Sequence, residues 1–295
     1  MARAFHRVAV LAGGPSSERE VSLRSGRAIA ASLSTIGYAT VLVEVCGRQF
    51  ELPPRTDAVF IALHGEFGED GEVQGILERM HIPYTGSGPE ACRRIFDKGR
   101  AFETLAAAGV PVPPSVIVRS PTSGSPLPLP VVVKPTRQGS SVGCTLVRAP
   151  SEWDGALAAA LAHNGEAIVQ TYLPGRELTV GVLGDRVLPP LEVVAPSGMF
   201  TFETKYTAGA AGLRCPAPIP MSLDAELRRL AWRTFQVLGA EGLGREDIRC
   251  SADGRPHVLE LNSIPGFTAT SLFPRAAAAA GVSFAQLCEQ VLNLA

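Results

Sequence analysis

The sequence predicts a mixed α/β protein whose first 80 residues form a layered, mostly parallel α/β unit. The short apolar run Arg7–Ala12 ends in a Gly-Gly-Pro-Ser-Ser turn, which is typical of a buried strand leading into a helix. That helix is expected over Glu18–Ile36, with Ser16 or Ser17 as its N-cap. Two more strands and a helix are expected at Ala39–Val45, Ala58–Leu63 and Asp70–Met80. This alternation indicates a parallel sheet covered by helices.

Helices and strand pairs alternate in the rest of the chain. One helix is expected over Glu90–Gly109, followed by an extended Pro-rich segment at 110–114 and an exposed linker at 120–130. Further strands are expected at Leu129–Lys134, Thr145–Arg148, Ala167–Tyr172, Glu177–Leu183, Arg186–Glu192, Ile248–Cys250 and His257–Leu261. Further helices are expected at Glu152–His163, Leu223–Leu238, Arg275–Ala280 and Ser283–Leu294.

The composition is that of an ordinary globular protein. Its 295 residues are 46% hydrophobic and 19% charged, enough chain for two or three compact units. A formal net charge of −1 argues against nucleic acid or an anionic membrane as a partner. No apolar run approaches the length of a membrane span. The six scattered cysteines indicate neither a zinc site nor a disulfide framework, so a reducing, cytoplasmic location is expected.

Two short segments flanking the turn at 251–254 carry a candidate metal site. Asp247 precedes the turn, and Glu260 and Asn262 follow it two residues apart. If the segments pair as a hairpin, the three side chains can converge on one face, because residues two apart on a strand point the same way. Three oxygen ligands are typical of Mg²⁺ beside a nucleotide. The alternative is a surface hairpin with solvated acids.

The segment 134–143 is a second candidate site. Lys134 ends an apolar strand, and a loop with two glycines and paired serines follows it. Backbone N–H groups, hydroxyls and the ammonium of such a loop can hold a triphosphate. The lysine precedes the glycines, so this is not the P-loop pattern, and Gly13-Gly14 lacks the spacing of a dinucleotide site. A plain hairpin connection is the alternative.

Polar residues also follow the first and third predicted strands. Glu18 and His64 lie just past the carboxyl ends of these strands, where open α/β sheets place ligands. The alternatives are an acid favoured in the first turn of a helix and a structural histidine.

Two later segments are candidates for binding the adenosine part of a nucleotide and for a lid over the site. The strand end at 170–173 can bond an adenine edge through its backbone, with Glu177 accepting from ribose hydroxyls. The segment 202–207 is expected to be a mobile loop, because Gly and Ala flank its polar and aromatic residues. Such a loop could act as a lid.

Eight segments carry distinctive motifs in this order: GGPSSEREVS (13–22), FIALHGEFGEDG (60–71), PYTGSG (83–88), DK (97–98), VVVKPTRQGSSVG (131–143), ETKY (203–206), GREDI (244–248) and LELNSIPGFTATSLFP (259–274). Together they span nearly the whole chain and resemble the D-alanine–D-alanine ligases of the ATP-grasp superfamily. The resemblance implies an ATP-grasp fold with an N-terminal parallel-sheet domain. The units implied are an N-terminal substrate domain (1–95), a central subdomain (96–186) and a C-terminal catalytic subdomain (187–295).

The resemblance also implies a role for individual residues. Those implied to contact ATP are Lys98, Lys134, Ser141, Gln170, Thr171, Leu173, Glu177 and Lys205. Those implied to bind two Mg²⁺ ions, for which Mn²⁺ can substitute, are Asp247, Glu260 and Asn262. Those implied for catalysis are Glu18, Ser140, Ser271, Tyr206 and Arg245. Those implied to bind D-alanine are Val21, His64, Gly266 and Leu272.

The reaction implied is the joining of two D-alanine molecules through an acyl-phosphate, with ATP converted to ADP and phosphate, for peptidoglycan synthesis. Relatives are commonly homodimers. Departures from the family pattern are Gln138 and Gln170 in place of Glu, Thr270 in place of His, and no second lysine after the DK pair. The alternatives are an ATP-grasp ligase with another acceptor and a non-catalytic nucleotide-binding module.

Overall fold

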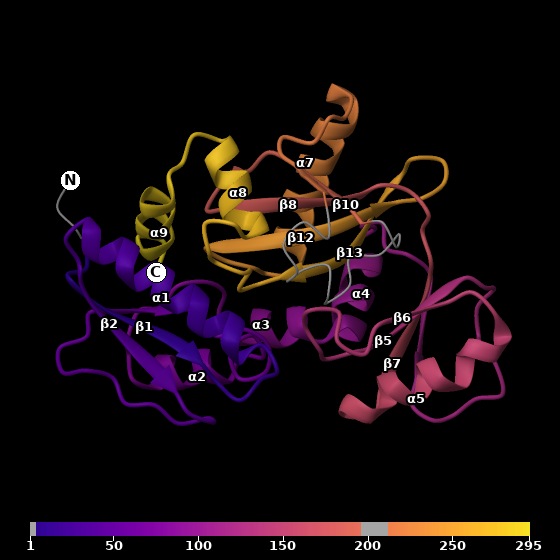
Figure 1. Cartoon of the computed structure of the whole chain (residues 1–295), viewed down its shortest axis with the longest axis horizontal. Helices are drawn as coiled ribbons and strands as arrows, with labels where there is room; N and C mark the ends of the chain where they lie inside the picture. Colours follow the sequence, from indigo (N-terminus) through magenta and orange to yellow (C-terminus); the bar gives the residue numbers. More distant parts are fainter. Residues whose placement is uncertain (1–3, 196–211) are drawn as a thin grey trace.

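The computed structural model describes residues 4–195 and 212–295, and they form three sheets with helices packed around them (Figure 1). The N-terminal sheet is parallel, as predicted, with β1 (Arg7–Gly13) between β2 (Ala39–Val45) and β3 (Ala58–Ile61). Helix α1 (Arg19–Thr35) packs against this sheet. The serine cap predicted for this helix is wrong. The N-cap is Glu18, and no side chain caps the helix. The Ser16 hydroxyl accepts from the Glu18 N–H at 3.1 Å and donates to the His64 carbonyl.

Three helices follow the first sheet: α2 (Glu72–Arg79), α3 (Pro89–Phe96) and α4 (Lys98–Ala107). The single helix predicted over Glu90–Gly109 is wrong, because Asp97 has an extended conformation that separates α3 from α4. Its carboxylate accepts from the Arg100 N–H at 3.2 Å, which caps α4. The Lys98 N–H donates to the carbonyl of Thr136 at 3.0 Å. The break therefore fixes the start of α4 beside the loop at 136–143.

An antiparallel sheet forms the centre of the chain. Its strands, in sheet order, are β4 (Ser115–Val118), β7 (Ala167–Thr171), β5 (Val131–Pro135) and β6 (Thr145–Val147). A short 3-10 helix (Pro150–Glu152) leads into α5 (Trp153–Asn164), which packs against β5, β6 and β7. Strand β4 was not predicted, since it lies next to the Pro-rich segment that reads as extended chain.

A larger sheet contains the predicted metal-binding hairpin. Its strands, in sheet order, are β11 (Gly212–Arg214), β10 (Leu191–Val194), β8 (Glu177–Leu183), β12 (Leu243–Cys250) and β13 (Pro256–Asn262), with β9 (Arg186–Val187) paired to β8. The predicted hairpin of β12 and β13 is confirmed, with antiparallel pairing throughout. The remaining helices are α7 (Met221–Val237), α8 (Leu272–Ala279) and α9 (Phe284–Leu292).

The last helix, α9, packs beside the first helix, α1. Figure 1 shows α9 beside α1, and the two helices share one core in which Leu287 and Val291 join Ile29 and Leu33. Helices α3 and α4 pack against the larger sheet in a second core. Burial of these apolar faces couples the N-terminal sheet to the larger sheet. The unit boundaries at residues 95 and 186 stay a prediction.

Within the described ranges, none of the helices has both the length and the apolar character required to cross a lipid bilayer.

Candidate active site

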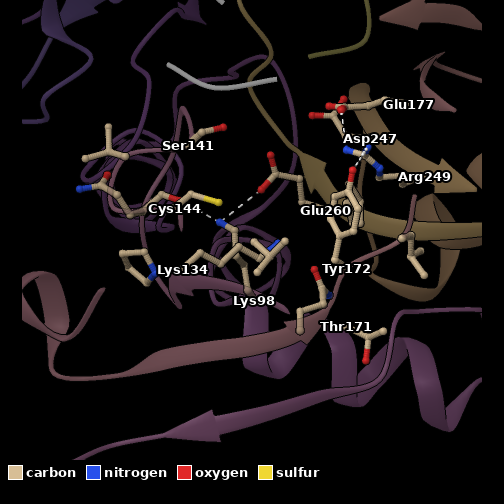
Figure 2. A pocket seen from close by; sticks show the side chains of 17 residues that line it. Lys98, Lys134, Ser141, Cys144, Thr171, Tyr172, Glu177, Asp247, Arg249 and Glu260 are labelled. Atoms are coloured by element: carbon tan, nitrogen blue, oxygen red, sulfur yellow. Dashed lines mark hydrogen bonds and ion pairs between the residues drawn. The ribbon is translucent and has the colours of Figure 1, made fainter. Parts of the chain in front are cut away.

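A cleft lies between the central antiparallel sheet and the larger sheet, and residues from both sides line it (Figure 2). Strands β5 and β7 contribute Lys134 and Gln170, while β12 and β13 contribute Asp247 and Glu260. Lys98, the first residue of α4, enters from the floor of the cleft. Residues that the sequence separates by more than 150 positions therefore face one space.

Two lysines meet the acidic residues in the cleft. The Lys98 ammonium lies 3.3 Å from a Glu260 carboxylate oxygen and donates to the Gln138 carbonyl at 2.8 Å. Figure 2 shows the Lys98 and Lys134 side chains on the same side of the cleft. The Lys134 ammonium lies 5.7 Å from the centre of the Phe102 ring. Two fixed cations in a partly enclosed space suit a polyphosphate.

The residues predicted to bind metal occupy neighbouring positions on β12 and β13. Asp247 pairs directly with Glu260, and Arg245 pairs with Asn262. The register shifts by one residue at this point, which leaves Leu259 as a bulge. Bulges re-aim side chains beside active sites, and here both Leu259 and Glu260 line the cleft. The hairpin prediction thus gave the right face, and the bulge was not foreseen.

The donor chemistry of this set fits a divalent cation. Asp247 receives two hydrogen bonds from the Arg245 guanidinium, at 2.9 and 2.8 Å. The Asn262 amide donates to Asp247 at 3.2 Å, so its own oxygen is not used in that contact. Carboxylate and amide oxygens are ligands that Mg²⁺ prefers. Within the described part of the chain no three His, Cys, Asp or Glu side chains group as a metal site, so any cation here would depend on Asn262 or a ligand oxygen.

Glu18, the N-cap of α1, meets the loop at 136–143. The Ser140 hydroxyl donates to one Glu18 oxygen. The other oxygen, Oε2, is buried and has no hydrogen-bond partner among the described residues. A Cβ at Gly139 would lie 2.3 Å from this oxygen, so only glycine allows the close approach. A buried, half-satisfied carboxylate suits a cationic ligand.

The loop itself has an unusual backbone. Ser140 and Ser141 have φ values of 50° and 61°, in the left-handed region that residues other than glycine rarely adopt. Two such residues in succession store conformational energy, and functional sites are where this is commonly found. Ser141 lines the cleft and Ser140 contacts Glu18, so the two serines face different ligand regions.

His64 follows β3 and contacts the loop at 264–267. Its Nδ1 lies 3.0 Å from the Ile264 carbonyl, which can only accept, so we assign the proton to Nδ1. Its Nε2 then accepts from the Ser25 hydroxyl at 3.0 Å, and that hydroxyl accepts from the Phe267 N–H. Burial lowers the pKa of His64, which keeps the ring neutral. His64 therefore positions the loop at 264–267 that carries Gly266.

The remaining predicted substrate residues lie at the start of two helices. Ser271 is the N-cap of α8, its hydroxyl accepts from the Thr268 N–H at 3.1 Å, and Leu272 opens the helix. Val21 lies in the first turns of α1 and is half-buried. Lys205, Tyr206 and the predicted lid fall outside the described residues.

Glu69 is a residue of the site that the sequence analysis missed. It accepts from the Gly65 N–H at 3.0 Å. Burial, with the Glu18 charge as the next cause, raises the pKa of Glu69 to about 8. Glu69 belongs to the motif at 60–71, but His64 was the residue of that motif predicted to lie in the site. Acidic residues are usually solvated, and the sequence alone does not show which of the three acids in this motif is desolvated in the fold.

Arg249 and Tyr172 form a cluster with the predicted residue Glu177 in the cleft, and the sequence analysis missed these two residues. The Arg249 guanidinium donates to Glu177 at 3.0 Å and to the Tyr172 hydroxyl at 3.1 Å (Figure 2). It also stacks over the Tyr172 ring at 4.9 Å. The backbone N–H groups of Thr171 and Tyr172 donate to Pro114 and Pro130, so these two donors are used within the protein. Leu173 also lines the cleft.

Comparison with known proteins gives one consistent result. The family profile "D-ala D-ala ligase C-terminus" matches residues 105–293, and "D-ala D-ala ligase N-terminus" matches residues 46–87. The D-alanine–D-alanine ligase of Methylacidiphilum infernorum is 41% identical over 287 residues, which are 97% of this chain and 94% of that protein.

Two solved structures resemble the whole chain. One is the D-alanine–D-alanine ligase of Bacillus anthracis complexed with ATP, with a TM-score of 0.85 and 26% identity, covering 98% of this chain and 97% of that chain. The other is the VanG D-Ala:D-Ser ligase of Enterococcus faecalis, also with a TM-score of 0.85, at 29% identity, covering 98% and 99%. The cleft residues, the family profiles and the full-length relative lead to one conclusion: this chain belongs to the D-alanine–D-alanine ligase family.

Proposed function

We propose that this chain is an ATP-dependent ligase that joins two molecules of D-alanine for peptidoglycan synthesis. The observation that carries the proposal is the arrangement of the cleft, in which Lys98 and Lys134 face Asp247 and Glu260. Paired cations suit the phosphates of ATP, and paired carboxylates suit the metal that accompanies them. The family relatives described above support the same reaction.

ATP lies along the cleft in this proposal. Lys98, Lys134 and Ser141 hold the phosphates, and Glu177 accepts from the ribose hydroxyls. Gln170, Thr171 and Leu173 surround the base. Asp247, Glu260 and Asn262 hold two Mg²⁺ ions, for which Mn²⁺ can substitute, and these ions screen the phosphate charge when bound.

The first D-alanine binds near Glu18. Its ammonium pairs with the Glu18 carboxylate, whose Oε2 is buried and has no hydrogen-bond partner among the described residues. The carboxylate of this D-alanine attacks the γ-phosphorus of ATP, the bond from that phosphorus to the bridging oxygen breaks, and ADP leaves. An acyl-phosphate results. Lys98 and Lys134 stabilise the charge on the transferred group.

The second D-alanine binds near Ser271. Its carboxylate lies at the N-terminus of α8, where backbone N–H groups favour an anion. Its amine attacks the acyl carbon, the bond from that carbon to the phosphate oxygen breaks, and phosphate leaves. Arg245, with the Gly266 N–H, stabilises the oxyanion of the tetrahedral intermediate. Tyr206 and Lys205 belong to the segment that closes over the site in this proposal.

Assembly and location follow from the family. We infer a homodimer in the cytoplasm, where all six cysteines would stay as free thiols. Light scattering on a size-exclusion column tests the dimer, and elution at the mass of one 31.0 kDa chain would exclude it.

The test of the function is ADP release by the purified protein with MgATP and D-alanine. Parallel reactions contain L-alanine, D-alanine with D-serine, and D-alanine with D-lactate, and mass spectrometry identifies each product. We expect turnover with D-alanine and a D-Ala-D-Ala product, and none with L-alanine. A D-Ala-D-Ser product would instead favour the acceptor named for the VanG ligase. ATP binding with no turnover under any condition would favour a non-catalytic nucleotide-binding module.

A further inference from the structure

Gln170 has a buried amide whose nitrogen has no partner in the part of the chain that the structure describes. The residue is 2% exposed, lines the cleft, and its Nε2 atom makes no hydrogen bond to any described residue. A buried donor without an acceptor is costly, and native proteins contain few of them. Such an atom at the wall of a binding cleft indicates that the ligand supplies the partner.

The position of Gln170 in the sheet identifies the part of the ligand that it faces. Gln170 pairs with Val132 across β5 and β7, and both residues line the cleft. Lys134 lies two residues further along β5, at the phosphate end. Leu173 lies on the other side, on the chain segment that leads to Glu177. Gln170 thus lies beyond the phosphates, among apolar side chains suited to a base.

Two nearby backbone donors are already used within the protein. The N–H groups of Thr171 and Tyr172 donate to the carbonyls of Pro114 and Pro130, at 2.9 and 3.1 Å. The Gln170 amide is therefore a side-chain group on this segment that can still recognise a base edge.

A primary amide can act as either partner in a hydrogen bond. Its nitrogen donates, its oxygen accepts, and rotation by half a turn exchanges the two positions. Purines differ at their 6-position: adenine carries an amino group that donates, and hypoxanthine carries an oxo group that accepts. The amide oxygen can therefore pair with adenine, and the amide nitrogen can pair with hypoxanthine. A carboxylate at the same place could only accept.

We propose that Gln170 sets the nucleotide specificity of the ligase and allows it to use 6-oxopurine triphosphates as well as ATP. The proposal rests on the proposed function, because the nucleotide is taken as the phosphoryl donor. In either case the γ-phosphoryl group passes to the D-alanine carboxylate, and the nucleoside diphosphate leaves. In the described orientation the amide nitrogen donates to the oxo group of inosine triphosphate. After half a turn the amide oxygen accepts from the amino group of ATP.

The test compares inosine triphosphate with ATP as substrates of D-alanine ligation. We expect the wild-type kcat/KM for inosine triphosphate to lie within about 30-fold of that for ATP. Gln170→Glu should lower this ratio by a further ~10- to 100-fold while ATP is still used, because the carboxylate repels the oxo group. The assay is run near pH 9, roughly five pH units above the ordinary pKa of a carboxyl group, so that the introduced side chain is ionised.

Two further variants separate a hydrogen-bond effect from a general one. Gln138→Glu adds the same charge to the same cleft, next to Lys98. It should change kcat/KM for both nucleotides by an equal factor. Gln170→Met keeps the length of the side chain but removes both hydrogen-bonding atoms, so kcat/KM should fall for both nucleotides. The ratio of kcat/KM for inosine triphosphate to that for ATP should lie between the ratios of wild type and Gln170→Glu.

The outcomes distinguish the two proposals. No turnover with either nucleotide would sink the proposed function, and the thermal shift produced by each nucleotide would then still measure base preference. Turnover with ATP alone, or a nucleotide ratio that is the same in wild type, Gln170→Glu and Gln170→Met, would overturn the role of Gln170. A guanosine triphosphate arm shows whether the cleft also admits a 2-amino group.

Discussion

The Lys98 ammonium and the Glu260 carboxylate form an ion pair of 3.3 Å across the floor of the cleft. They come from the first residue of α4 and from β13, and both side chains are largely buried. The pair depends on the break at Asp97, since a continuous helix would turn residue 98 to another direction. A cation therefore lies beside a candidate metal ligand.

Asn262→Ala should abolish ligation and leave the fold intact. The variant removes a candidate metal oxygen and its contact to Asp247, so turnover should fall by at least about 100-fold. ADP release over a range of Mg²⁺ concentrations measures this, with thermal unfolding as a check on the fold. Asn293→Ala, at the exposed C-terminal end of α9, is the matched control and should match wild type. Full activity in Asn262→Ala would place the metal elsewhere.

Ser140→Ala and Ser141→Ala should affect different substrates. Ser140 donates to Glu18, so its loss should raise KM for D-alanine by about 10-fold with little change for ATP. Ser141 lines the cleft in which ATP is proposed to bind, so its loss should raise KM for ATP instead. Both serines have positive φ, which makes the backbone cost of alanine similar in the two variants. Equal effects of both variants on both substrates would contradict the assignment.

Arg249→Met should weaken ATP binding more than catalysis. The arginine is 7% exposed, donates to Glu177 and Tyr172, and stacks on the Tyr172 ring. Without it the Glu177 carboxylate loses a partner, and KM for ATP should rise by about 10-fold with a smaller change in kcat. Arg249→Lys should not restore KM, because a lysine lacks the planar fork that makes both contacts. An unchanged KM in Arg249→Met would show that the cluster has no part in binding.

Glu246 should make stability depend on pH. It lies between Arg245 and Asp247 on β12 but points to the other face, where it is fully buried and accepts from Thr234 at 3.1 Å. Burial raises the pKa of Glu246 from 4.5 to about 8. Between these values the unfolded chain is ionised and the folded chain is protonated, so this group's contribution to stability falls as pH rises.

The comparison with Glu246→Gln measures that effect. The free energy of unfolding of Glu246→Gln, minus that of wild type, should increase from about pH 4.5 to about pH 8, by up to roughly 1.4 kcal/mol per pH unit. Urea unfolding at several pH values gives the difference, in which the contributions of other titrating groups cancel. Parallel pH curves for the two proteins would mean that Glu246 is ionised in the folded chain.

Local patterns in the sequence predicted much of the architecture. The apolar run at 7–12 and the strands after it gave the parallel sheet, and alternation along 245–247 and 260–262 gave the face that carries Asp247, Glu260 and Asn262. Each depends on side-chain periodicity within one strand, which the sequence shows directly. The break at Asp97 was missed, because the residues on both sides favour a helix and the hydrogen bond to Thr136 comes from another part of the chain.

The motifs of the sequence by themselves determined the family and predicted most residues of the candidate site, because these residues occur in short segments with characteristic spacing. Only the tertiary structure decided how they are used. Burial gave Glu69 and Glu246 raised pKa values, and it left one oxygen of Glu18 and the amide nitrogen of Gln170 without partners among the described residues. The cluster of Arg249, Glu177 and Tyr172 joins three separate segments. Desolvation and long-range pairing depend on which surfaces pack together, and no local pattern specifies that.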